Sequence, residues 1–213
     1  MRAPFQDFSG IAARIRGANI NTDAIIPAAW LRTAHADLGR GLFARWRYDD
    51  AGNETGEFVL NREPFRRARI LVADENFGCG SSREAAVWAL MQFGISCVLA
   101  PSFADIFYEN AFRNGLLVGR IGSDVLAELD AAISAHPHAP VLAIVLSKAT
   151  IAGPDGTSHS FAIPGSRAQA LLRGDDEIAV TLGHLTEIEA FHKAMEQSMP
   201  WLYRSPGSGW HSP

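Results

Sequence analysis

Residues 69–121 read RILVADENFGCGSSREAAVWALMQFGISCVLAPSFADIFYENAFRNGLLVGRI, and this stretch determines the fold class. Two apolar runs, at 69–73 and 97–100, have the composition of buried strands, and a third strand is expected at 116–121. Between them, residues 82–94 and 103–114 carry helix-forming residues, and the second segment ends in Asn-Gly. Strands that alternate with helices in this way predict βαβ units and a parallel sheet.

The sequence on either side of this stretch is less regular. The first sixty residues, with apolar pieces at 11–15 and 58–60, indicate a β-rich layer of strands and loops. On the other side we expect a helix over 124–135 with Ser123 as its N-cap, strands at 141–146 and 159–163 flanking a GPDG turn, and helices at 166–172 and 187–197. Together these elements predict one α/β domain over residues 1–204. The Pro-, Gly- and Ser-rich residues 205–213 are expected to form a mobile tail.

Composition excludes several classes of protein. The 213 residues are 47% hydrophobic and 20% charged, which is typical of a globular domain, and the net charge of −4 comes without a Lys/Arg run. Nucleic acid is therefore not expected as a partner. No apolar run approaches the roughly 18–20 residues of a membrane span, and the first residues do not resemble a signal peptide. We expect a cytoplasmic protein with no membrane partner.

The segment NFGCGSSRE, residues 76–84, is the sharpest local feature. Gly78 and Gly80 permit a tight turn, and Ser81 and Glu84 have the spacing of a capping box that would begin a helix at Ser81. A helix N-terminus beside the forked guanidinium of Arg83 suits a carboxylate or a developing oxyanion. The alternative interpretation is a plain turn before a helix, and the spacing matches neither common phosphate-binding glycine loop.

Several motifs together resemble a known family. They are NTDAIIPAAWL (21–31), FARWRYD (43–49), ENFGCGSSRE (75–84) and APSFADIFYENAFRNGLL (100–117). In this order they resemble the small subunit of isopropylmalate isomerase, which is similar to the C-terminal swivelling domain of aconitase. The resemblance covers about residues 5–200 and implies a single swivelling domain with a three-layer β/β/α arrangement. It also implies a hydro-lyase that is active only with a large subunit, as a heterodimer or heterotetramer.

The resemblance also implies a division of labour between the subunits. A [4Fe–4S] cluster is expected in the large subunit, with no cofactor or metal bound by this chain. Cys79 and Cys97 agree with this, because two thiolates are fewer than the three or four that usually hold such a cluster. The family's catalytic base corresponds to Ser81, while Arg83 is assigned to a substrate carboxylate and Ser82 to hydrogen bonding beside it.

The loop after the NTD motif is expected to select the substrate. Ile25, Ile26 and Leu31 could form an apolar wall for an isopropyl group, whereas Arg32 could bind the additional carboxylate of homoaconitate. The alternative is that the isoleucines pack in the core while Arg32 is solvated.

One departure from the family pattern keeps other functions open. Ala85 and Val87 replace the usual His and Pro after GSSRE. A dehydratase of a related malate, such as citramalate or dimethylmalate, is therefore an alternative. A non-catalytic regulatory subunit and a hydrolase that uses Cys79 are two further classes.

Overall fold

The computed structural model describes residues 3–32 and 37–203. The chain divides into two compact units, residues 2–174 and residues 175–213 with Met1, and each is described here by itself. In the described ranges, no helix is long and apolar enough to cross a membrane. The predicted mobile tail, residues 205–213, lies outside the described residues.

The larger unit is built on a seven-stranded sheet with the strand order β4-β3-β2-β1-β5-β6-β7. Its strands are β1 (Phe8–Ile15), β2 (Ala68–Ala73), β3 (Cys97–Ala100), β4 (Leu117–Arg120), β5 (Val141–Val145), β6 (Thr150–Ala152) and β7 (Ser158–Ser160). Strands β1 to β4 pair in parallel, whereas β5, β6 and β7 continue the sheet in antiparallel pairs. The predicted mixed α/β fold with a parallel core is thereby confirmed.

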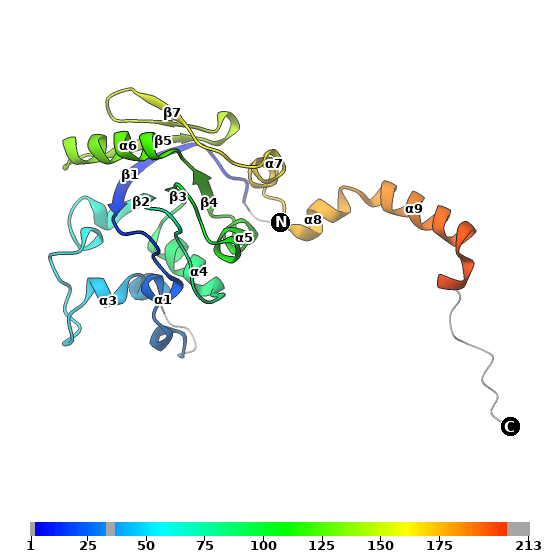
Figure 1. The fold of residues 1–213 in the computed structure, drawn as a ribbon, viewed down its shortest axis with the longest axis horizontal. Coiled ribbons are helices and arrows are strands. Elements are labelled where there is room, and N and C mark those ends of the chain that lie inside the picture. The colour runs from blue at the N-terminus through cyan, green and yellow to red at the C-terminus, as the bar shows by residue number, and fades with distance from the viewer. Residues whose placement is uncertain (1–2, 33–36, 204–213) are drawn as a thin grey trace. The chain divides into compact units, whose positions relative to one another are not determined.

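Helices connect the parallel strands and cover the sheet. Helix α4 (Glu84–Phe93) joins β2 to β3, and α5 (Asp105–Asn114) joins β3 to β4. Helix α6 (Ser123–Ala135) follows β4, and α7 (Gly165–Arg173) ends this unit. In Figure 1, α4 and α5 lie on one side of the strands and α6 lies on the other. Both α4 and α5 end at glycines with positive φ, as the Asn-Gly at the end of α5 predicted.

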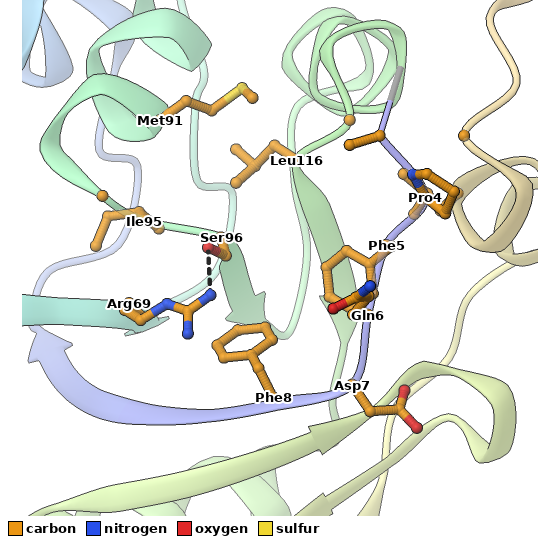
Figure 2. A pocket seen from close by; sticks show the side chains of 15 residues that line it. Pro4, Phe5, Gln6, Asp7, Phe8, Arg69, Met91, Ile95, Ser96 and Leu116 are labelled. Carbon is orange, nitrogen blue, oxygen red and sulfur yellow. Dashed lines mark hydrogen bonds between the residues drawn. The ribbon is translucent and has the colours of Figure 1, made fainter. Parts of the chain in front are cut away.

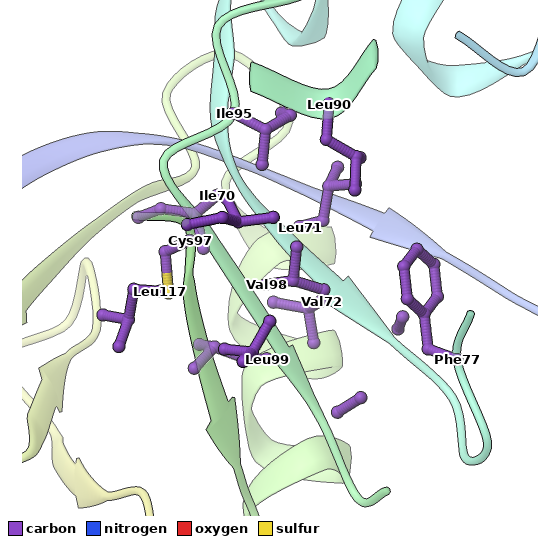
Figure 3. Close-up of a cluster of buried hydrophobic side chains, with 14 of the residues drawn as sticks. Ile70, Leu71, Val72, Phe77, Leu90, Ile95, Cys97, Val98, Leu99 and Leu117 are labelled. Atoms are coloured by element: carbon purple, nitrogen blue, oxygen red, sulfur yellow. The ribbon is translucent and has the colours of Figure 1, made fainter. Parts of the chain in front are cut away.

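The core lies between the parallel strands and these helices, as Figure 3 shows. Strand β3 is buried along its whole length, and β2 is buried except at Arg69. Strands that are covered on both faces are continuously apolar, and for this reason the runs at 69–73 and 97–100 could be predicted as buried strands from the sequence. From α4, Leu90 points into the same cluster.

The predicted capping box is wrong. Helix α4 begins at Glu84 with Arg83 at the N-cap position, and no side-chain hydrogen bond caps it. Glu84 instead accepts a 2.7 Å hydrogen bond from Asn114 Nδ2 at the end of α5, and Trp88 Nε1 donates to Asn114 Oδ1 at 2.9 Å. The side chain of Glu84 is thus engaged by the neighbouring helix rather than by its own N-terminus, and Ser81 stays in the preceding loop.

The predicted β-rich N-terminal layer is correct only for the apolar piece at 11–15, which lies in β1. After β1, the described residues up to 67 form short helices: α1 (Thr22–Ile25), η1 (Ala28–Leu31), α2 (Leu38–Gly41), α3 (Ala44–Arg47), η2 (Val59–Asn61) and η3 (Phe65–Arg67). Side-chain caps start two of them, since Asn21 accepts from Ala24 N–H and Asp37 from Arg40 N–H. The apolar piece at 58–60 contributes instead to the helical turn η2, which no side-chain hydrogen bond caps.

A third correction concerns the strands on either side of the GPDG turn. The turn joins β6 to β7. Strand β6 was not predicted; it follows the helical turn η4 (Leu146–Lys148), which comes directly after β5. Helix α6 includes Ser123 as its first residue rather than as its N-cap. The smaller unit contains α8 (Glu177–Leu182), which was not predicted, α9 (Leu185–Ser198), which was, and η5 (Pro200–Leu202).

Candidate active site

Two chain segments meet beyond the carboxyl ends of β1 and β2. The segment after β1 pairs with the loop after β2 through a parallel bridge between Asn21 and Cys79. Thr22 N–H donates to the Cys79 carbonyl at 2.8 Å, and Gly78 N–H donates to the Ile20 carbonyl at 2.8 Å. Because the carboxyl ends of parallel strands are the usual place for sites in such sheets, this paired loop is the candidate active site.

A carboxylate fastens the beginning of this loop. Asp74 accepts a 2.6 Å hydrogen bond from Gly17 N–H and pairs with the guanidinium of Arg14. Burial by itself raises the pKa of Asp74, but the Gly17 N–H and Arg14 outweigh it and hold the pKa below its ordinary value. The ionised form of Asp74 therefore ties the ends of β1 and β2 together.

Gly78 permits the close approach of the loop to α5. Its φ is +80°, and a Cβ atom added there would lie 2.2 Å from Phe107 Cγ. Phe107 is buried and packs edge-on against Phe77 at a centroid distance of 5.3 Å. The glycine predicted for a tight turn is thus also required for packing against α5.

Ser81 and Ser82 lie exposed in the loop between this turn and α4. The Ser81 carbonyl accepts a 2.9 Å hydrogen bond from Thr22 Oγ1, and Thr22 itself is buried at 2% exposure. The backbone of Ser81 is therefore fixed while its side chain is at the surface. The motif resemblance assigned Thr22 no chemistry, and its position in the NTD motif was the available signal.

Arg83 is brought to α1 by an ion pair. Its Nη1 contacts the carboxylate of Asp23 and lies 3.3 Å from the Ile26 carbonyl. Both contacts use Nη1, so the other N–H groups of the guanidinium have no partner among the described residues. Arg83 can therefore be held by Asp23 and still offer donors to a second carboxylate.

The predicted substrate loop separates into buried and exposed residues. Ile25 and Ile26 are fully buried and pack in the core. Leu31 is 41% exposed and Arg32 is exposed. A cavity of about 860 Å³ adjoins this loop, and its lining includes Trp30 and Arg32. Two more arginines, Arg40 and Arg45, line the same cavity; sequence reasoning had not singled them out, although Arg45 lies in the FARWRYD motif.

The residues present do not fit an iron–sulfur cluster. Cys97 is fully buried in β3, and burial raises the pKa of its thiol. Cys79 is half-buried, and its thiol donates to the Asn19 carbonyl at 3.2 Å. Within the described part of the chain, no group of three or more His, Cys, Asp and Glu side chains could hold a metal ion.

A second cavity, of about 750 Å³, lies at the amino ends of the parallel strands (Figure 2). There the Arg69 guanidinium stacks over the Phe8 ring at 4.2 Å and donates to Ser96 Oγ at 3.4 Å. This cavity contains no predicted site residue, and it is at the opposite end of the strands from Ser81.

Comparison with known protein families identifies the class of protein to which this fold and these paired loops belong. Residues 2–121, which include β1 to β4 and the whole candidate site, match the aconitase C-terminal domain family. The chain therefore belongs to the aconitase C-terminal domain family.

The full-length relatives are more specific. The chain is 44% identical to the 3-isopropylmalate dehydratase small subunit of Parvibaculum lavamentivorans, with 93% of this chain and 98% of that protein aligned. It is 45% identical to the protein of the same name from Dinoroseobacter shibae, with the same coverage. The crystal structure of 3-isopropylmalate dehydratase from Methanocaldococcus jannaschii matches with a TM-score of 0.61 and 26% identity, over 89% of this chain and 99% of that one. This chain belongs to the 3-isopropylmalate dehydratase small-subunit family.

Proposed function

We propose that this chain is the small subunit of a 3-isopropylmalate dehydratase, a hydro-lyase of leucine biosynthesis that works in the cytoplasm with a large subunit. The reaction interconverts 2-isopropylmalate and 3-isopropylmalate through 2-isopropylmaleate. The observation that carries the proposal is the loop that presents Ser81 and Ser82 at the surface beside Arg83, in a chain that belongs to this family. A loop that carries such groups and is open to solvent suits a site completed by another subunit.

Ser81 is the proposed base. In the dehydration direction its oxygen takes a proton from the substrate carbon α to a carboxylate, and the electron pair of that C–H bond forms the alkene as the hydroxyl leaves the adjacent carbon. In the hydration direction Ser81 gives the proton to the carbon that lost the hydroxyl, and hydroxide adds to the carbon that lost the proton, so that one water is removed and one is added. The [4Fe–4S] cluster, which we assign to the large subunit, supplies Lewis acidity toward the substrate hydroxyl.

A serine oxygen needs electrostatic stabilisation to act as a base. The N-terminal end of α4, three residues after Ser81, and the guanidinium of Arg83 are the positive groups that this chain provides. Arg83 is proposed to bind a substrate carboxylate through the N–H groups that Asp23 leaves unused, and Ser82 to donate a hydrogen bond beside it.

Substrate choice is proposed to depend on Leu31 and Arg32, which reach the surface. Leu31 would contact the isopropyl group, while the buried Ile25 and Ile26 would act by setting the course of the loop. The exposure of Arg32, together with Arg40 and Arg45 in the same cavity, favours one alternative: a related hydro-lyase whose substrate carries a further carboxylate, such as homoaconitate.

An anaerobic assay with the cognate large subunit and a reconstituted cluster tests the proposal. Alkene formation would be followed from 2-isopropylmalate, citramalate and homocitrate. We expect turnover only when both subunits are present, with 2-isopropylmalate preferred. A preference for homocitrate would support the alternative through Arg32. Absence of turnover with every substrate and a loaded cluster would favour a non-catalytic subunit.

A further inference from the structure

The proposed base lies in a stretch of backbone that its own helix does not hold. Helix α4 begins at Glu84 and no side-chain hydrogen bond caps it, so Ser81 and Ser82 precede the first helical turn. On the other side lies Gly80, whose φ is +92°. Because glycine adopts either sign of φ readily, the loop by itself determines the position of Ser81 poorly. A contact from another segment must therefore fix it.

Thr22 provides such a contact on both sides of Gly80. Its N–H donates to the Cys79 carbonyl at 2.8 Å, and its Oγ1 donates to the Ser81 carbonyl at 2.9 Å. A Cβ atom added at Gly80 would lie 3.6 Å from Thr22 Oγ1, so the glycine itself lies against the threonine. The two carbonyls belong to the peptide groups before Gly80 and after Ser81. One residue thus holds both ends of the segment that contains the flexible glycine and the base.

Thr22 is itself firmly held. It is 2% exposed and is the first residue of α1, where the Asn21 side chain accepts from Ala24 N–H at 2.8 Å as the N-cap. The Thr22 carbonyl accepts from Ile26 N–H at 2.9 Å, and Ile25 and Ile26 are fully buried. The branched Cβ of threonine also restricts the rotation of its side chain. The Thr22 hydroxyl is therefore a fixed point against which the loop can be positioned.

The next residue of α1 holds the other functional side chain, since Asp23 pairs with Arg83. The two neighbours thus have separate tasks, Asp23 toward the guanidinium and Thr22 toward the backbone of the base. We propose that Thr22 is a positioning residue of this site, whose hydroxyl holds the Ser81 carbonyl and thereby directs Ser81 Oγ toward the substrate carbon. Thr22 is buried and acts through Ser81 rather than on the substrate. This inference rests on the proposed function, because it takes Ser81 as the base.

Two substitutions of Thr22 separate its hydroxyl from its methyl group. Thr22→Val has nearly the same shape but lacks the donor, whereas Thr22→Ser keeps it. Both variants keep the N–H that holds the Cys79 carbonyl. In the anaerobic assay with the large subunit and 2-isopropylmalate, we expect Thr22→Val to lower kcat about 10- to 100-fold, because a small misplacement of a reacting group is costly. KM should change less than about threefold, since Arg83 stays paired with Asp23. Thr22→Ser should keep kcat within about threefold of the wild type.

Thr55→Val is the matched control. Thr55 Oγ1 also donates to a main-chain carbonyl, that of Trp46, at 3.1 Å, but it belongs to the loop after α3. Its replacement removes the same kind of hydrogen bond and should leave kcat unchanged. Thr22→Ala takes the place of Thr22→Val should the valine variant not fold, and the same loss of kcat is expected for it.

A double variant shows whether Thr22 acts through Ser81. In the Ser81→Ala background, Thr22→Val should lower the remaining activity by less than about twofold, because the group that it positions is gone. A further loss as large as that in the wild-type background would overturn the inference. So would a wild-type kcat for Thr22→Val, or equal losses of kcat for Thr22→Val and Thr22→Ser.

The same set of variants separates this inference from the proposed function. Loss of kcat in Ser81→Ala but not in Thr22→Val would remove this inference alone and leave Ser81 as the base. A near wild-type kcat for Ser81→Ala, or no turnover by the wild-type pair of subunits, would overturn the proposed function and this inference with it.

Discussion

Replacing Gly78 with alanine should disconnect the candidate active-site loop from α5. The added Cβ would lie 2.2 Å from Phe107 Cγ and 2.6 Å from Phe107 Cβ, so the loop or the ring must move by more than about 1 Å to reach ordinary van der Waals contact. Overpacking of a buried contact costs about 1–3 kcal/mol, and a left-handed backbone costs alanine about 1–2 kcal/mol. We therefore expect Gly78→Ala to lower the free energy of unfolding by about 2–5 kcal/mol.

Gly80→Ala is the matched control. Gly80 also has a positive φ, of +92°, but its nearest neighbour for an added Cβ is Asn21 Cβ at 3.3 Å. Gly80→Ala should therefore lower the free energy of unfolding by only about 1–2 kcal/mol, mainly because alanine is disfavoured in a left-handed backbone conformation. Urea unfolding of the full chain, followed by circular dichroism, would measure both variants. Equal losses of stability for Gly78→Ala and Gly80→Ala would refute the argument that Phe107 sets the requirement for glycine.

Three other substitutions have expected outcomes. Asp23→Asn should raise KM about tenfold with little change in unfolding free energy, because it releases Arg83 from a partly exposed ion pair; an unchanged KM in steady-state assays would contradict this. Asp74→Asn should cost about 2 kcal/mol at pH 7. Because the folded-state pKa of Asp74 is lowered, its stabilisation is present above the unfolded pKa of about 3.9 and is lost as the pH falls through the folded value. The unfolding free energies of the wild type and of Asp74→Asn should therefore converge in acid, and a constant difference between them down to pH 2 would contradict the role given to Asp74. Asn114→Ala removes the link between Trp88 and Glu84 and should cost about 1–2 kcal/mol in urea unfolding without changing kcat or KM.

The parts of the fold that were predictable are those that local sequence specifies. Strands β2 and β3 are apolar because both faces of the sheet are covered, and glycines end α4 and α5 where the chain must enter the left-handed region. The short helices before residue 68 were missed because their apolar residues follow no long period. Local caps and contacts with the core determine them instead.

The candidate site was predicted in part, for a similar reason. The motif resemblance directed attention to Ser81, Ser82 and Arg83, but the contacts that position them are long-range. Arg83 meets Asp23, and Thr22 meets the Ser81 carbonyl, across about sixty residues of sequence. The apparent capping box had the right spacing, yet the partner of Glu84 is Asn114, thirty residues away. Spacing alone cannot choose between a local and a distant hydrogen-bond partner.

The role of Ser81 is the central claim, and one substitution tests it most directly. Ser81→Ala and the control Ser160→Ala, at an exposed position of β7, would be assayed with the large subunit and 2-isopropylmalate under anaerobic conditions. We expect Ser81→Ala to lower kcat by about 10³-fold or more at unchanged affinity for the large subunit, and Ser160→Ala to match the wild type. A near wild-type kcat for Ser81→Ala would show that another group removes the proton.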